Sequence, residues 1–211
     1  MAISDYASLQ SAIIDTAMRT GDTAFAAAVP DFITDAEFMM NYGYGDIPAI
    51  RTRDMETSAT VTVTGGAGTL PADYLEYRSV SGNSSTIYPL DPISPDYRIR
   101  EYPDAAATQA QFFDIVGSTI TTSPPSDSNL TLNYFAKIPA LSVSNTTNWL
   151  LTKAPQIYKY AALVHAAPYM MNDERAQVWG DLYSKAVSAL IQSDRRGKYS
   201  RPTARVRGYA P

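Results

Sequence analysis

The stretch that decides the fold is Asn133–Arg196, NYFAKIPALSVSNTTNWLLTKAPQIYKYAALVHAAPYMMNDERAQVWGDLYSKAVSALIQSDRR. A strand ends at Ile138-Pro139, and after a polar loop two helices follow with a break at Pro168. Pro155 suits the first turn of the first helix. The second helix repeats apolar residues at three- and four-residue spacing, which predicts one broad buried face: Val178, Trp179, Leu182, Tyr183, Ala186, Val187 and Leu190. Asn172 is its expected N-cap, and Arg195 and Arg196 suit its C-terminal end.

Two further helices are predicted near the N-terminus. The first covers residues 4–20, with Ser4 as the cap and Gly21 as the end. Its expected apolar side consists of Tyr6, Leu9, Ile13, Ala17 and Met18. The second lies between Asp22 and Asn41, with Pro30 either in its first turn or at a kink. Its expected apolar side consists of Phe32, Ile33, Ala36, Met39 and Met40.

The pattern between these helical regions is typical of β-structure. The period falls toward two, and Gly, Pro, Ser and Thr separate short runs. The predicted strands are Thr57–Thr64, Tyr74–Val80, Thr86–Leu90, Tyr97–Glu101, Gln111–Val116, Ser118–Thr122 and Leu130–Lys137. The glycines at Gly65–Gly68 are expected to form a turn, because the Gly-Lys-Ser/Thr of a phosphate-binding loop is missing.

The predicted fold class is therefore α+β. We expect an antiparallel bundle of two N-terminal and two C-terminal helices, with an inserted antiparallel β-rich domain. The expected segments are 1–46 for the first helices, 47–140 for the insertion and 141–196 for the helical hairpin. Residues 197–211 have no apolar period and are expected to form an extended basic arm.

Composition narrows the possible functions. Hydrophobic residues make up 45% and charged residues 18% of the chain, which indicates a folded protein whose surface largely meets other protein. There is no cysteine, and we expect neither a secretion signal nor a membrane span. The net charge is −4, yet residues 195–211 hold six of the 17 basic residues and no acid. The preceding residues therefore carry 11 basic against 21 acidic side chains.

No catalytic, metal-binding or cofactor-binding set can be assembled from these residues. His165 is the only histidine, and neither a nucleophile nor an orienting partner accompanies it. Asp31 and Asp35 share a helix face, but acids in a first turn or in solvent are the commoner explanation. We therefore expect no enzyme activity and no cofactor.

The basic tail and the 15 tyrosines are the features with functional potential. The tail cations could bind DNA phosphates, with a salt slope of about −5 for six contacts. Alternatively, the tail could follow an acidic groove on a protein, since hydrophobic residues alternate with its cations. The residues expected in this arm are Arg195, Arg196, Lys198, Tyr199, Arg201, Arg205, Val206, Arg207 and Tyr209. Tyrosine suits protein interfaces and also sugar binding.

Several segments, taken in order, resemble the head-to-tail adaptor (connector) family of tailed bacteriophages, best known from short-tailed phages. These segments are VPDFITDAEFMMN (29–41), LPADYLEYRSV (70–80), IPALSVSNTTNWLLTKAPQIYKYAALVHAAPYM (138–170), NDER (172–175), Val178-Trp179 and SDRR (193–196). The resemblance covers most of the chain.

The resemblance implies a structural virion protein in the neck between capsid and tail, assembled in the host cytoplasm. It implies a dodecameric ring whose partners are the portal protein and tail or nozzle proteins, with double-stranded DNA passing through the lumen during ejection without specific binding. In this family the C-terminal arm docks on the portal, so the arm residues are the expected portal contacts. The alternatives are a nucleic-acid-binding module that acts through the basic tail and a carbohydrate-binding β module.

Overall fold

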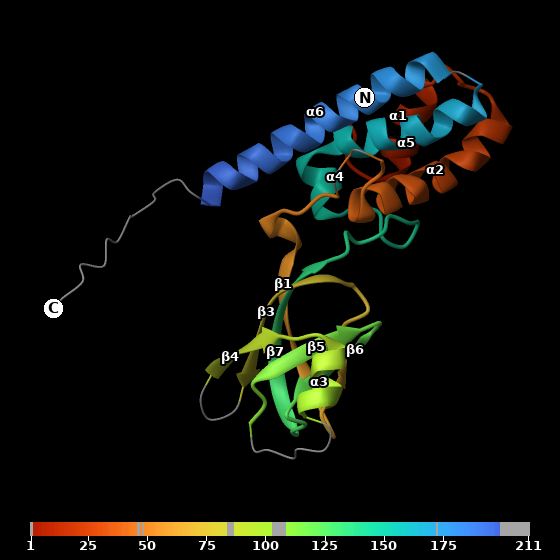
Figure 1. The fold of residues 1–211 in the computed structure, drawn as a ribbon. Helices are drawn as coiled ribbons and strands as arrows, with labels where there is room; N and C mark the ends of the chain where they lie inside the picture. Colours follow the sequence, from red (N-terminus) through yellow and green to blue (C-terminus); the bar gives the residue numbers. More distant parts are fainter. Residues whose placement is uncertain are drawn as a thin grey trace. The chain divides into compact units, whose positions relative to one another are not determined.

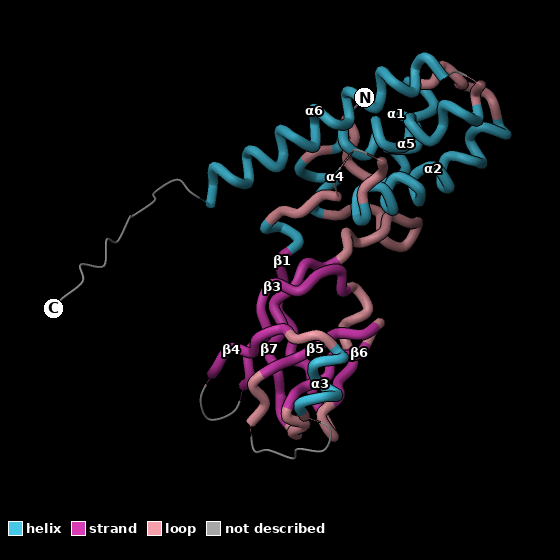
Figure 2. Tube along the Cα trace, viewed as in Figure 1, coloured by secondary structure: helices cyan, strands magenta, loops and turns pink. Residues whose placement is uncertain are grey.

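The computed structural model describes residues 2–45, 47, 49–83, 87–102, 109–171 and 173–198. The chain divides into two compact units (Figure 1). The helical unit comprises the described residues up to Arg53 and from Ile138 onward, and the β unit comprises Asp54–Lys137. Helices dominate the first unit and strands the second (Figure 2). The expectation of a mixed helix-and-strand fold is confirmed.

The two N-terminal helices are α1 (Tyr6–Thr16) and α2 (Thr23–Tyr42). The expected Ser4 cap of α1 is wrong, because the Asp5 carboxylate accepts the Ser8 N–H at 2.8 Å and the Ser8 hydroxyl completes a capping box. Gly21 is not the end of α1 either. The helix already ends at Thr16, and Met18 adopts the left-handed conformation with φ 57°. Pro30 lies in the interior of α2, which begins after an Asp22 cap.

The C-terminal part contains three described helices where two were expected: α4 (Trp149–Lys153), α5 (Pro155–Tyr169) and α6 (Asp173–Lys198). The extra division follows from Pro155, because a proline disfavours helical backbone in the residue before it. Ala154 accordingly leaves the helical region at φ −146° and ψ 66°. Pro155 opens α5 as predicted, and α5 ends one residue after Pro168. The expected Asn172 cap lies outside the described residues.

Helix α5 is the centre of the helical unit. It packs against α1, α2, α4 and α6, whereas α2 and α6 make at most marginal contact with each other. Three consecutive residues of α5, Ala161, Ala162 and Leu163, are buried, so the helix is covered on several sides. The remaining large core side chains come from its neighbours: Leu9, Ile13, Phe25, Ile33, Met39, Met40, Leu150 and Tyr183. Both N-terminal apolar faces are buried as predicted, except for Met18.

The β unit holds seven described strands in one nearly closed sheet. They are β1 (Glu56–Val63), β2 (Ala67–Thr69), β3 (Tyr74–Asn83), β4 (Ile87–Pro92), β5 (Phe112–Val116), β6 (Thr119–Ser123) and β7 (Ser128–Ala136), and a 3₁₀ turn (Arg53–Met55) precedes β1. The order across the sheet is β1-β7-β3-β4-β5-β6-β2, and the end strands β1 and β2 also contact each other. The expected wholly antiparallel sheet is wrong at one place, because β4 and β5 pair in parallel.

Two further local expectations fail in the β unit. Strand β2 begins inside the predicted glycine turn, because Ala67–Thr69 pairs with β6. The predicted strand Tyr97–Glu101 is instead the helix α3 (Pro95–Glu101). The hydroxyl of Ser94 caps α3 by accepting the Tyr97 N–H at 3.2 Å, and Pro95 occupies the first turn.

The β unit has a hydrophobic core of its own. Inward residues of most strands form one cluster: Val61, Val63, Val80, Leu90, Phe113, Ile120, Leu130, Leu132 and Tyr134. Alternate residues of β1 and β7 point to this core and to solvent, as the period of two requires.

Candidate protein–protein interface

The C-terminal arm begins at the end of α6. Arg195 and Arg196 are exposed on the last turn of α6, and the helix continues to Lys198, two residues beyond the expected boundary at residue 196. The other predicted arm residues lie outside the described residues: Tyr199, Arg201, Arg205, Val206, Arg207 and Tyr209. The structure therefore places the base of the arm on a helix end and leaves its portal contacts a prediction.

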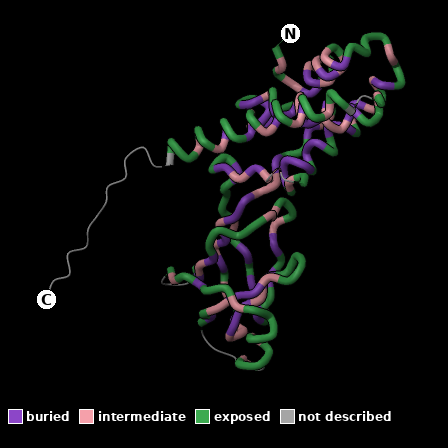
Figure 3. Tube along the Cα trace, turned by 45° about the horizontal axis from the view of Figure 1, so that its top comes forward, coloured by how far each residue is buried: buried purple, intermediate pink, exposed green. Residues whose placement is uncertain are grey.

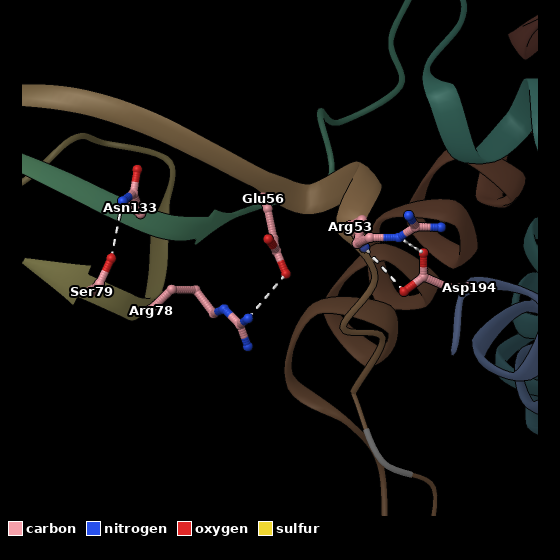
Figure 4. A network of polar contacts seen from close by, with 6 residues as sticks. All are labelled: Arg53, Glu56, Arg78, Ser79, Asn133 and Asp194. Atoms are coloured by element: carbon pink, nitrogen blue, oxygen red, sulfur yellow. Dashed lines mark hydrogen bonds and ion pairs between the residues drawn. The ribbon is translucent and has the colours of Figure 1, made fainter. Parts of the chain in front are cut away.

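An ion pair holds this end of α6 to the chain that leads into β1. Arg53 Nε lies 2.8 Å from Asp194 Oδ1, and the Arg53 N–H donates to Asp194 Oδ2 at 3.4 Å (Figure 4). The guanidinium of Arg53 also contacts Gly197, one turn further along α6. Asp194 thus anchors the basic end of α6 to Arg53. Sequence reasoning missed this pair because its members are 141 positions apart.

Helix α6 carries apolar side chains on its solvent-facing side as well as on its buried side. Trp179, Tyr183 and Leu190 are buried as predicted, but Val178 is 56% and Leu182 is 37% exposed. The prediction that all seven apolar residues are buried is therefore wrong, because α6 packs mainly on α5 and a single neighbouring helix covers only part of its circumference. Figure 3 shows exposed residues along the length of this helix.

Helix α2 also exposes large apolar side chains. Phe38 is 61% and Tyr42 is 52% exposed, and their ring centroids lie 4.7 Å apart. Exposed aromatic pairs of this kind are typical of surfaces that another protein covers. The helical unit thus presents apolar groups on two of its helices, α2 and α6.

A buried polar network fixes the segment that follows the β unit. The Glu37 carboxylate accepts the Leu141 N–H at 2.7 Å and the Tyr158 hydroxyl at 3.3 Å. Asn148 donates to the Tyr158 oxygen at 2.6 Å, and Asn41 accepts the Ile138 N–H at 3.0 Å. These bonds attach residues 138–148 to α2 and α5. Nothing in the local sequence indicates the bonds from Ile138 and Leu141, because their acceptors on α2 are about 100 positions away.

Burial controls the ionisation of this network. It raises the pKa of Glu37 to about 7, against the opposing effect of the bond from Leu141. Burial, followed by the nearby Glu37 charge, raises the pKa of Tyr158 as well. Glu37 is therefore a buried group of the helical unit whose charge changes near neutral pH.

The β unit carries a shallow polar pocket of about 270 Å³ on β1, β3 and β7. Its lining residues are Glu56, Thr57, Ser58, Arg78, Asn133 and Tyr134. Arg78 and Glu56 form an ion pair at 3.5 Å, and Asn133 donates to Ser79 (Figure 4). Tyr134 is buried and donates to Asp73 at 2.9 Å, and burial raises its pKa to about 12. Because four of its six lining residues already pair with other protein groups, the pocket offers a ligand few free partners.

Tyrosines are exposed on both units. In the β unit, Tyr77 is 38% and Tyr97 is 48% exposed. In the helical unit, Tyr42, Tyr44 and Tyr169 are each more than half exposed. Among the described residues, the tyrosines that are more than half exposed therefore belong to the helical unit.

The fold brings one pair of the candidate acid–base residues close enough to interact electrostatically, because the Asp35 charge opposes the burial-driven lowering of the His165 pKa. His165 lies edge-on to the Tyr44 ring at 5.7 Å, and burial lowers its pKa. Asp31 and Asp35 are exposed on α2. Within the described residues no cluster of His, Asp and Glu could hold a metal ion. In the same part of the chain, no helix is both long and apolar enough to span a membrane.

Exposed apolar side chains on α2 and α6 and a basic helix end indicate surfaces that other proteins can cover. Residues 4–207 match the family described as SU10 adaptor protein, so the chain belongs to this family of phage head-to-tail adaptors. A search of curated proteins finds no match. The family is structural and not a class of enzymes, and its role implies a place in the virion neck and contacts with portal and tail.

Proposed function

We propose that this protein forms a dodecameric ring below the portal, extends the DNA channel toward the tail and offers the platform on which the tail assembles. Membership of the head-to-tail adaptor family is the observation that carries this proposal. In it, the segments expected from the sequence have separate tasks. The helical segments form the ring, the inserted β unit faces neighbours or tail proteins, and the basic arm docks on the portal.

The position of the arm supports the portal-docking part of the proposal. The arm follows a helix of 26 residues whose last turn is anchored by Arg53. A rigid base reduces the entropy lost when the segment beyond it binds. The arm sequence alternates cations with Tyr199, Val206 and Tyr209, which suits an acidic protein groove with hydrophobic pockets.

Charge supports the channel part of the proposal. The 194 residues before the basic end carry 11 basic and 21 acidic side chains. A negative lumen repels DNA phosphates, so DNA passes without being retained. Host-cell assembly and the passage of DNA during ejection complete the proposed role.

The experiment compares two arm variants with a truncation that removes residues 199–211 and leaves α6 intact. The variant Y199S/V206S/Y209S keeps all arm cations, and R201Q/R205Q/R207Q keeps all hydrophobic anchors. We expect the truncation to abolish co-sedimentation with the portal protein and both variants to weaken it at least tenfold. Portal binding that survives the truncation would overturn arm docking. Loss of DNA retention in the Arg-to-Gln variant alone, with portal binding intact, would instead favour a nucleic-acid-binding module.

A further inference from the structure

The helical unit has two different outward faces on the two helices that flank α5. Helices α2 and α6 both pack on α5, which lies between them in Figure 1, and they make at most marginal contact with each other. Each turns its buried side chains toward the core and its exposed ones outward. The unit therefore carries one exposed helix face on each flank.

The α2 flank, defined as Asp31, Asp35, Phe38 and Tyr42, is acidic and aromatic. These residues recur at three- and four-residue spacing and so share one face of the helix. All four are exposed. Helix α2 contains no Lys or Arg in its 20 residues, so no cation on the helix itself offsets the two carboxylates.

The α6 flank, defined as Arg175, Val178, Leu182 and Lys185, is cationic at both ends and apolar in the centre. The same spacing places these residues on one face, and all four are exposed. Glu174 and Asp181 lie along one edge of this face. The two flanks have similar lengths, about 15 Å at 1.5 Å per residue.

We propose that neighbouring copies in the ring meet through these two surfaces, with the α2 flank of one copy packed on the α6 flank of the next. This inference rests on the ring proposed above. A closed ring needs two different surfaces on each subunit. The apolar centre of the α6 flank covers Phe38 and Tyr42. Whichever way the helices run, Arg175 or Lys185 then lies opposite the two aspartates.

Charge also disfavours the alternative pairings. Two α2 flanks facing each other would bring four carboxylates together without a cation on either helix. Two α6 flanks would bring their arginines and lysines into one interface. Like charges facing each other across an interface favour other partners. The heterologous pairing is the one that supplies cations to the two carboxylates of the α2 flank, whereas in an α6–α6 pairing Glu174 and Asp181 would offset only part of the like charge.

Cross-linking in assembled particles tests the proposal directly, because the chain has no cysteine of its own. Particles are prepared with F38C/V178C, with each single variant and with F38C/Q177C, whose second thiol lies about 100° around α6. After treatment with a short bis-maleimide, we expect F38C/V178C to give a ladder of dimers, trimers and higher species. Neither single variant should form more than traces of dimer, and F38C/Q177C should give a ladder at least fivefold weaker.

Charge reversal provides a second, independent measurement. D31K/D35K and R175E/K185E should each reduce incorporation into necks at least tenfold, and the variant that combines all four changes should recover most of it. An efficient F38C dimer, or a combined variant no better than either parent, would overturn the pairing. An F38C/V178C protein that is present in necks but forms no ladder rejects the pairing alone, whereas absence of the unsubstituted protein from necks rejects the proposed function. Thermal unfolding of each purified variant shows whether the fold is intact.

Discussion

Glu37 shows how a single residue can connect parts of the chain that the sequence keeps apart. It lies on the buried side of α2, only 7% exposed, among side chains that are otherwise mostly apolar. A buried carboxylate requires partners, and here they are the Leu141 N–H and the Tyr158 hydroxyl. The apolar period of α2 was predictable, but the need for this acid was not, because its partners belong to segments more than 100 positions away.

The ionisation of Glu37 predicts a stability that falls as pH rises. Its pKa is about 7 in the folded protein and 4.5 as the ordinary value for an unfolded chain, so the folded state binds more protons between these limits. This contribution is complete below the lower value and is lost as pH rises through the upper one. From Glu37 alone we expect the free energy of unfolding to fall by about 3 kcal/mol between about pH 5 and about pH 8 in urea titrations, and the lowered pKa of His165 opposes part of this fall.

The variant E37Q tests this assignment, since glutamine keeps the accepting oxygen and cannot ionise. Its stability should change far less over the same pH range and should exceed that of the original protein at the alkaline end. The matched control is D31N, which removes an exposed carboxylate of the same helix that takes no part in the Glu37 network. Parallel pH profiles for E37Q and the original chain would show that another group titrates.

At the scale of single elements, α3 explains where sequence patterns mislead. Tyr97 and Ile99 alternate with Arg98 and Arg100, which is the period of a strand. The competing signal was the Ser94 cap followed by Pro95, and this local backbone chemistry prevails. No residue of α3 is buried, so its attachment depends on contacts with β5.

The main such contact is an ion pair with a buried acid. Arg98 Nε lies 2.9 Å from Asp114 Oδ1, and the Asp114 side chain is 1% exposed. Burial raises the pKa of Asp114, and the Arg98 charge opposes this effect. Arg98 therefore supplies the counter-ion for the carboxylate of Asp114, which is buried inside the β unit.

Removing one partner of this pair should lower the free energy of unfolding more than replacing both partners does. R98A leaves Asp114 buried without a counter-ion, and we expect the β unit to lose about 3 kcal/mol of unfolding free energy. R98M/D114L should recover most of that loss, because two apolar side chains replace the two charges. Chemical denaturation of the single and double variants measures both values. A double variant less stable than R98A would show that the ion pair contributes net stability.

Helix α6 shows what an apolar sequence pattern does not distinguish. Its apolar spacing correctly predicted a long helix and the burial of Trp179, Tyr183 and Val187. It did not separate these residues from Val178 and Leu182, because an apolar face is the same in sequence whether its own chain or another one covers it. The excess of apolar residues over buried ones is itself informative, since it marks the outward face of the helix.

At the scale of the whole molecule, chain connectivity makes the β unit an insertion. The unit is one continuous segment, Asp54–Lys137, whereas the helical unit is built from segments on both sides of it. Its two ends are neighbours, because the first and last strands pair with Glu56 opposite Phe135. The sequence predicted the helix–strand–helix order, but it could not predict the parallel β4–β5 pair, since periodicity shows which face a residue occupies and not which strand lies beside it.

An insertion whose ends adjoin should be separable from its host. The fragment 54–137 keeps its whole core cluster and its sheet, so we expect it to unfold cooperatively with a free energy on the order of 5 kcal/mol. Replacing 54–137 by a short Gly–Ser linker should leave a helical protein in which Glu37 still binds Leu141, because both residues remain. Circular dichroism and urea unfolding of each product measure these outcomes. A fragment 54–137 that does not unfold cooperatively would show that the β unit depends on the helices for its stability. A linker-joined helical chain that does not unfold cooperatively would show that the helices depend on the β unit.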